Sequence, residues 1–255
     1  MINTKTAIAV AKAVALMLVA SSAHAQLTNL VTNGGFEQTT LSQANRHFGG
    51  LLVLNNGTPA SGLDNWTNQS RWSVVVPPSE ISNILWTTAN GGLKTITPSP
   101  DGGNFLTMDG DSTLHGALSQ NISGLTPGNN YKLSFYSALG QQERHYGNTW
   151  DWMSVSFGSQ QALAWATPGV PTQLPWKDFT GWQQFNYTFQ ATAANQALSF
   201  LAYGGPNGLP PLTLLDGVSL VDVTAPVPEP EEWAMMLVGA GLVSFQVRRK
   251  QAKVS

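Results

Sequence analysis

Every second residue is apolar in several stretches of this chain, and this alternation is what most constrains its fold. The clearest stretches are residues 131–135, 153–157, 185–189 and 218–221. Because successive side chains of a strand point to opposite faces, each stretch predicts a β-strand with one buried face. Turns rich in glycine and proline separate the stretches, as at residues 33–35, 101–103, 126–129 and 204–208. No amphipathic helix is evident in residues 26–226, so we expect an all-β sandwich or jelly roll.

Charged residues are scarce, and this limits the classes of function. They make up 10% of the chain, against roughly 25% in ordinary soluble domains. Residues 26–226 carry six basic and eleven acidic side chains, a net charge of −5, which argues against binding nucleic acid through its phosphates. Asn, Gln, Ser, Thr and Gly supply the polarity instead, a profile common in extracellular β-proteins. The chain has no cysteine, which excludes a thiolate zinc site, a cysteine nucleophile and disulfides.

The first 25 residues have the pattern of a secretory signal peptide. Two lysines precede an apolar stretch at residues 13–20, and Ala23 and Ala25 supply the small residues of an A-x-A cleavage site. We expect the mature chain to begin at Gln26, after export across the inner membrane.

A proline-rich motif, an apolar run and a basic cluster follow one another near the C-terminus. They are Val227, Pro228, Glu229 and Pro230, then residues 233–247, then Arg248 and Arg249. An apolar run followed at once by cations behaves as a stop-transfer segment. The run has 15 residues, about 22 Å as a helix, which is shorter than the roughly 20 residues of a membrane span. We therefore expect only transient membrane insertion.

This ordered triplet resembles the PEP-CTERM sorting signal of Gram-negative bacteria. The resemblance implies that a membrane protease of the exosortase type recognises the motif and removes the tail, with the cell surface or the extracellular matrix as destination. A simple tail anchor behind a proline-rich linker is the alternative. The expected parts are a signal peptide (1–25), a β-sandwich domain (26–224), a linker with the sorting motif (225–232) and a hydrophobic segment with a basic tail (233–255).

A second resemblance covers nearly the whole mature domain. Five segments occur in the order found in galactose-binding-like jelly rolls, a fold of several carbohydrate-binding module families: residues 29–37, 100–106, 118–128, 181–189 and 215–220. The resemblance implies a jelly-roll β-sandwich whose first and last strands lie side by side. It does not specify a ligand.

Two acidic residues mark the ends of this expected domain. Glu37 closes the first expected strand and Asp216 opens the last. The same resemblance implies a structural calcium ion at such a corner, held by these two carboxylates. The backbone of Gly34 and Gly35 can approach an ion closely, because glycine has no Cβ. Two solvated acids at strand ends are the alternative. The acidic motif at residues 109–111 lacks a full calcium-loop pattern and is interpreted as a turn.

Two tryptophans suggest a ligand-binding surface. Trp150 and Trp152 alternate with Met153 and the other apolar residues of their stretch, so they are expected to face outward. Flat indoles beside Asn, Gln and Asp side chains suit sugar rings, whose C–H faces stack on aromatic rings. The alternative is that a long loop, residues 164–179, covers them with its own tryptophans, because tryptophan is usually buried.

No motif of a known catalytic class appears in the sequence. It has no H-E-x-x-H or G-x-S-x-G pattern, and the acid pair Glu143 and Asp151 is interpreted as solvated. We therefore expect a non-enzymatic, exported protein of the cell surface or of an exopolysaccharide matrix. A lectin-like module that binds a glycan at Trp150 and Trp152 is the main alternative, and a polysaccharide hydrolase comes third.

Overall fold

The computed structural model describes residues 28–40, 46–47, 51–53, 62–167 and 170–224. The expected signal peptide, the sorting motif with its arginines and the hydrophobic segment lie outside these residues and stay predictions. Within the described residues, no helix is long and apolar enough to cross a membrane.

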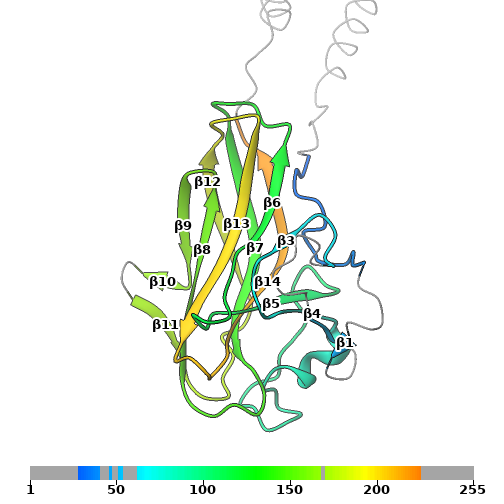
Figure 1. Cartoon of the computed structure of the whole chain (residues 1–255), viewed down its shortest axis with the longest axis vertical. Helices are drawn as coiled ribbons and strands as arrows, with labels where there is room; N and C mark the ends of the chain where they lie inside the picture. The colour runs from blue at the N-terminus through cyan, green and yellow to red at the C-terminus, as the bar shows by residue number, and fades with distance from the viewer. Residues whose placement is uncertain (1–27, 41–45, 48–50, 54–61, 168–169, 225–255) are drawn as a thin grey trace, which may run out of the picture.

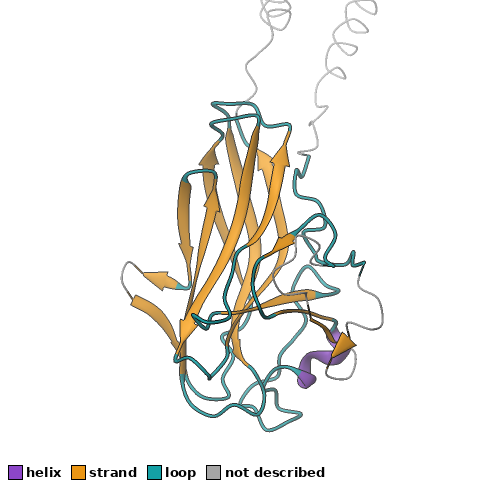
Figure 2. Cartoon of the chain, in the orientation of Figure 1, coloured by secondary structure: helices purple, strands orange, loops and turns teal. Residues whose placement is uncertain are grey.

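The domain is an all-β sandwich of two antiparallel sheets, which confirms the expected fold class (Figures 1 and 2). Sheet I has the order β1 (Arg46–His47), β2 (Leu51–Val53), β4 (Ser73–Val76), β5 (Phe105–Asp109), β14 (Pro211–Asp222), β7 (Asn130–Gln141) and β12 (Gln183–Gln190). Sheet II has the order β10 (Ala166–Thr167), β11 (Val170–Leu174), β8 (Thr149–Phe157), β13 (Asn195–Gly205), β6 (Leu118–Ser123) and β3 (Thr67–Asn68), and β9 (Gln160–Ala164) also pairs with β8.

The main hydrophobic core fills the space between the two sheets. It is built from the apolar positions that alternate along β7, β8 and β13, including Leu133, Val155 and Phe200. All three are fully buried, and the polar residues between them are more exposed. The alternation predicted from the sequence is therefore the packing of the sandwich.

A second hydrophobic cluster covers the other face of sheet I. It contains Val74, Phe105 and Leu214 from the sheet, packed against Ile81 of the 3-10 helix η2 (Pro78–Asn83) and against Phe179. Sheet I is thus buried on both faces where β4 and β5 run, and every residue of these two strands is buried. This double burial explains why neither strand shows a simple alternation of apolar and polar residues.

The segment at residues 29–37 is not a strand, which corrects the sequence-based expectation. It forms bends and turns, with positive φ angles at Asn33 (52°) and Phe36 (58°). It nevertheless lies along β14, because Leu30 N–H donates to Leu220 O (2.9 Å) and Val218 N–H donates to the Gly34 carbonyl (3.0 Å). The two terminal segments of the domain are therefore neighbours, although they do not pair as strands.

Candidate functional site

Asp216 lies in the interior of β14 and not at its start, which corrects its expected place. It is fully buried, and neither carboxylate oxygen makes a hydrogen bond within the described residues. The Ser99 hydroxyl and the Gly217 N–H are near enough to favour the ionised form, without reaching hydrogen-bond geometry. Burial, with a smaller contribution from the charges of Asp101 and Glu37, raises the pKa of Asp216 to about 7.

Glycines bring three carboxylates to this corner of the sandwich. A Cβ on Gly35 would lie 3.0 Å from Asp101 Oδ2 and 3.9 Å from Asp216 Oδ1, so both oxygens approach this backbone. Glu37 lies against Gly103 and accepts a 2.5 Å hydrogen bond from the Asn104 N–H. The charge of Glu37 also acts on Asp216, and a metal site shared by the two residues stays a prediction. The sequence interpretation missed Asp101, although its Asp-Gly-Gly turn was visible.

The oxygen-only chemistry of this corner fits a calcium ion, which prefers carboxylate and carbonyl ligands. The unpartnered, buried oxygens of Asp216 are the observation that favours a cation there. As the side chains lie, however, no group of three or more Asp, Glu, His or Cys residues in the described part of the chain is arranged to hold a metal ion. A calcium ion would be held by Asp216 and Asp101, with Glu37 turning away from Asn104 to join them.

A second group of acids lies where β5 ends and β8 begins. Asp109 accepts a hydrogen bond from the Asp111 N–H (2.8 Å), so the motif at residues 109–111 is a turn, as expected. Asp151 is fully buried, and this corrects its interpretation as a solvated acid. Burial raises the pKa of Asp109 to about 6 and raises that of Asp151 well above its ordinary value. Glu143 does not join them, because it pairs with Arg144 at 3.2 Å.

Trp150 and Trp152 face outward from sheet II, as the alternation predicts. Both are half-buried, while Asp151 and Met153 between and beside them are fully buried. The Trp152 ring stacks on Tyr203 of β13, with centroids 4.2 Å apart and planes 7° apart. A Cβ on Gly205 would lie 2.7 Å from the Trp150 ring, so Trp150 rests against the backbone of β13. The two indoles are therefore held in fixed positions on the outer face.

The alternative, in which the tryptophans of residues 164–179 cover Trp150 and Trp152, is not seen in the described part of this segment. Trp165 turns inward, where its Nε1–H donates to the Ser137 hydroxyl (2.9 Å), and its ring contacts Phe185. Trp176 lies at one end of the sandwich with other aromatic residues. Among the described residues, neither ring contacts the ring of Trp150 or Trp152, and the segment forms the hairpin β10–β11 beside β8.

Neutral side chains surround the two tryptophans. The strands of sheet II contain a single charged residue, the buried Asp151. The outward positions of β8 and its neighbours hold the aliphatic side chains of Leu163 and Leu201 and many hydroxyl, amide and aromatic groups: Ser154, Ser156, Ser199, Tyr203, Ser119, Asn121, Gln161 and Gln173. Such a face offers hydrogen bonds and stacking without a charge that would select a charged ligand.

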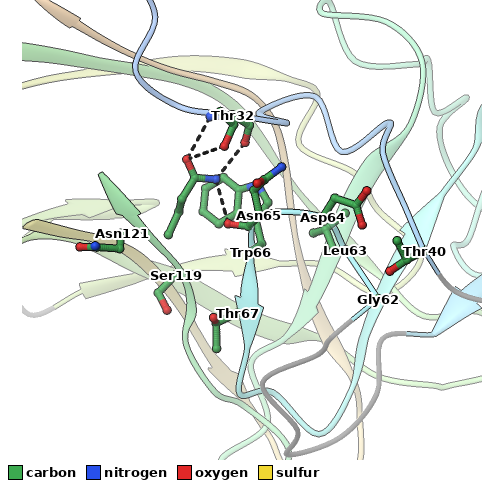
Figure 3. Close-up of a pocket in the computed structure, with 11 residues that line it drawn as sticks. Thr32, Thr40, Gly62, Leu63, Asp64, Asn65, Trp66, Thr67, Ser119 and Asn121 are labelled. Atoms are coloured by element: carbon green, nitrogen blue, oxygen red, sulfur yellow. Dashed lines mark hydrogen bonds between the residues drawn. The ribbon is translucent and has the colours of Figure 1, made fainter. Parts of the chain in front are cut away.

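A pocket of about 520 Å³ opens at the β3 edge of the same sheet (Figure 3). Thr67, Ser119 and Asn121 line its side toward the outer face. The polar groups of its inner wall already hydrogen-bond to one another, because the Gln120 amide donates to the carbonyls of Thr32 (2.8 Å) and Asn65 (3.1 Å). The pocket thus continues the polar surface of sheet II, with Asp64 as a charged residue among those that line it.

Neither a family model nor a curated protein matches this chain. Among solved structures, one described as TmCBM61 in complex with beta-1,4-galactotriose is 14% identical, with a TM-score of 0.39 and coverage of 76% of this chain and 99% of that one. A CBM4 structure is 16% identical (TM-score 0.34, 75% and 99% covered). The CBM22-1 xylan-binding domain from Paenibacillus barcinonensis Xyn10C is 12% identical (TM-score 0.31, 64% and 88% covered). These neighbours are β-sandwich carbohydrate-binding modules, and likeness at this level transfers no ligand.

Proposed function

We propose that this protein is a non-catalytic, lectin-like carbohydrate-binding β-sandwich whose site is the outer face of sheet II. The observation that carries the proposal is the pair of outward, half-buried indoles of Trp150 and Trp152, fixed by Gly205 and Tyr203. Fixed aromatic rings lose little conformational entropy when a sugar stacks on them. The uncharged hydroxyl and amide groups around them can exchange hydrogen bonds with sugar hydroxyls, so we expect a neutral glycan.

The proposed setting is the outside of a Gram-negative cell. The sequence of the two chain ends supports export, transient anchoring and removal of the tail by an exosortase-type protease. A calcium ion at the corner of Asp216 would have a structural role, because that corner lies on β14 of sheet I and the tryptophans lie on sheet II. A carbohydrate-binding protein processed in this way would link the cell surface to an exopolysaccharide.

A glycan array with neutral and acidic oligosaccharides tests this function. The wild-type protein should bind neutral glycans, and the double variant Trp150→Ala/Trp152→Ala should lose roughly 1–3 kcal/mol of binding free energy, the range found when an aromatic stacking partner is removed. Val223→Ala is the control, because Val223 is an exposed apolar residue that follows β14 of sheet I, outside this face. Unchanged binding by the double variant would contradict the site.

Two other outcomes separate the remaining classes of function. Absence of glycan binding by the folded wild-type protein would favour a purely structural role in the matrix. Release of reducing ends from a polysaccharide by the wild-type protein, lost on substitution of Asp109 or Asp151, would favour a hydrolase.

A further inference from the structure

A cluster of aromatic residues lies at the end of the sandwich where β7 ends and β8 begins, and it shares no residue with the outer face of sheet II. Its rings belong to three separate segments of the chain. Tyr146 lies in the connection from β7 to β8, Trp176 follows β11, and Trp86 follows η2. The ring centroids of Tyr146 and Trp176 are 5.6 Å apart, and both contact Trp86 at 6.2 Å and 6.4 Å.

This aromatic cluster is both exposed and held in place. Tyr146 is 65% exposed and Trp176 is 38% exposed, whereas Trp86 is buried beneath them. The indole N–H groups of Trp86 and Trp176 both donate to the His145 carbonyl at 3.1 Å. The Trp176 backbone N–H also donates to Asn148 Oδ1 (2.8 Å). Two exposed rings in fixed positions form a surface on which a flat ligand can stack.

A lysine ammonium group lies within the cluster. Lys177 Nζ is 4.6 Å from the centroid of the Trp86 ring and 4.5 Å from that of Trp176. The backbone of Gly91 lies beside it, since a Cβ there would be 3.7 Å from Nζ, an ordinary van der Waals contact. The Lys177 backbone N–H is tied to Gln141 Oε1 (2.8 Å), which fixes the base of the side chain. The cation is therefore stabilised by aromatic faces and not by an anion.

The other charges at this end of the sandwich already have partners. Lys94 pairs with Asp178 at 2.8 Å, and Arg144 pairs with Glu143 at 3.2 Å. Among the described residues, Lys177 makes no ion pair and its ammonium group makes no hydrogen bond. Three of the six basic residues between positions 26 and 226 lie at this end, in a domain whose net charge is −5. Lys177 is thus a cation without an ion-pair partner in the described part of the chain, and it lies beside exposed aromatic rings, which favours an anionic ligand.

We propose that this aromatic cluster is a second saccharide site, selective for sugars that carry a carboxylate, such as uronic acid residues. The exposed rings of Tyr146 and Trp176 would stack on the pyranose, and Lys177 would pair with its carboxylate. One cation beside two small exposed rings matches one charge on one sugar ring better than it matches the extended backbone of an acidic peptide. The proposal does not depend on the neutral face, because the two surfaces share no residue.

Isothermal titration calorimetry with short uronic acid oligosaccharides tests the proposal. Oligogalacturonides, oligoglucuronates and oligoguluronates are each compared with their carboxyl-reduced forms, which keep the sugar rings and lose the charge. At least one acidic form should bind more tightly than its reduced form. Lys177→Met should weaken that binding roughly tenfold, the equivalent of one charge-assisted contact of about 1.4 kcal/mol, and should remove the preference for the acid. Lys177→Arg should retain the preference for the acid.

Matched variants make the test specific. Lys132→Met removes an exposed lysine near the opposite end of β7 and should leave binding unchanged. Tyr146→Ala changes a side chain that is 65% exposed, so the protein should fold and lose affinity for acidic and reduced forms alike. Trp150→Ala/Trp152→Ala should bind uronic acid oligosaccharides as the wild type does, even though its binding of neutral glycans at the outer face of sheet II is weakened.

Three results would overturn the proposal. They are no binding of any acidic oligosaccharide, equal binding of acidic and reduced forms, and an acid preference that survives Lys177→Met. Tighter binding of a glutamate-rich peptide than of every uronic acid oligosaccharide would likewise replace the saccharide by a protein partner.

Discussion

At the scale of single residues, three buried carboxyl groups are the side chains whose protonation and cation binding should affect the stability of this domain. Asp109, Asp151 and Asp216 are all buried, and each has at least one oxygen without a hydrogen-bond partner in the described part of the chain. An unpaired buried carboxylate is costly, so each group is either protonated or neutralised by a cation. The raised pKa values of the three residues show that burial favours the protonated, neutral form of each.

Calcium should stabilise the protein through Asp216. An ion that binds only the folded state stabilises it by about 2.7 kcal/mol at a hundredfold excess over its Kd. We expect calcium to raise the melting temperature and EDTA to lower it by several degrees. Asp216→Asn should remove this response yet leave a folded domain, since an amide resembles the neutral acid that burial favours. Glu37→Gln and Asp101→Asn should weaken it. Identical melting curves with calcium and with EDTA would exclude the metal.

Stability of the metal-free protein should fall as the pH rises from about 4 to about 7. The pKa of Asp109 is raised from 3.8 to about 6 and that of Asp216 to about 7. Between the unfolded and folded pKa values, the folded state binds more protons than the unfolded state. The free energy of unfolding therefore decreases with pH, by at most about 1.4 kcal/mol per pH unit for each group. Urea unfolding of the metal-free protein between about pH 4 and about pH 7 measures this free energy of unfolding.

The Asp109→Asn/Asp216→Asn variant is the control for this pH dependence. Its amides do not titrate, so its stability should vary less with pH, with Asp151 as the remaining buried acid. Stability of the metal-free wild type that rises between about pH 4 and about pH 7 would contradict the raised pKa values.

The local sequence pattern predicted the orientation of the two tryptophans, but it did not predict the positions of two of the acidic residues. The outward orientation of Trp150 and Trp152 follows from the period of a single strand, so the sequence suffices for it. Asp101 reaches Asp216 only because the turn before β5 lies against β14, a contact that no local pattern contains. The burial of Asp151 was missed for a similar reason. Its position alternates with the tryptophans, which shows that it faces inward, but only the packed sheets show that water is excluded.

At the scale of elements, the bulge in β14 decides which side chains reach the core. The pairing of β14 with β7 shifts register between Asp216 and Ser219. Before the bulge Leu215 faces the core between the sheets, and after it Val218 and Leu220 do, so the inward positions change from odd to even. The bulge leaves Asp216 on the opposite face of sheet I, with Leu212 and Leu214. One inserted residue thus places the acid corner.

Gly217→Ala should destabilise the domain by about 1–3 kcal/mol, because Gly217 has a positive φ of 59° and its new Cβ would lie 3.0 Å from atoms of Asp101 and Tyr136. Gly124→Ala is the matched control. Gly124 also has a positive φ, of 78°, but no atom lies within 4 Å of its added Cβ. Chemical unfolding of both variants measures the difference, and equal losses would show that the bulge contacts contribute nothing.

The segment at residues 29–37 shows why a local sequence pattern can predict a strand where none forms. Its sequence resembles an opening strand, and it does lie beside β14. A Cβ on Gly34 would lie 2.1 Å from the Val218 carbonyl oxygen, so only a residue without a side chain fits at this position. The turn with positive φ at Asn33 and Phe36 follows from this close approach. A contact made by residues nearly two hundred positions apart is not visible in a local pattern.

At the scale of the whole molecule, the strands nearest the C-terminus lie inside the sheets. β14 lies between β5 and β7, and β13 lies between β8 and β6. Alternation along each strand predicted a sandwich, but not this order, because it depends on pairing between distant segments. Neither sheet can be completed before the last strands are present, so folding depends on contacts of long sequence separation.

The protein recovered from the surface of its native host should lack both chain ends. We expect intact-mass analysis to show loss of residues 1–25 and of the region after about residue 226, because the apolar run is too short for a permanent membrane span. Substitution of Pro228 and Pro230 by alanine should leave the tail attached. A surface form that retains residues 233–249 would contradict processing.

The position of the end of β14 determines which end of the domain is joined to the C-terminal segment. Asp222 is five residues before Val227, at most about 17 Å of extended chain. Val223 N–H donates to the Asn130 carbonyl at the start of β7, whereas Gln141 at the other end of β7 holds the Lys177 backbone. In a precursor still held by its tail, the tail would therefore leave the domain at the end where β7 begins, and the aromatic cluster around Lys177 would lie at the opposite end of the domain.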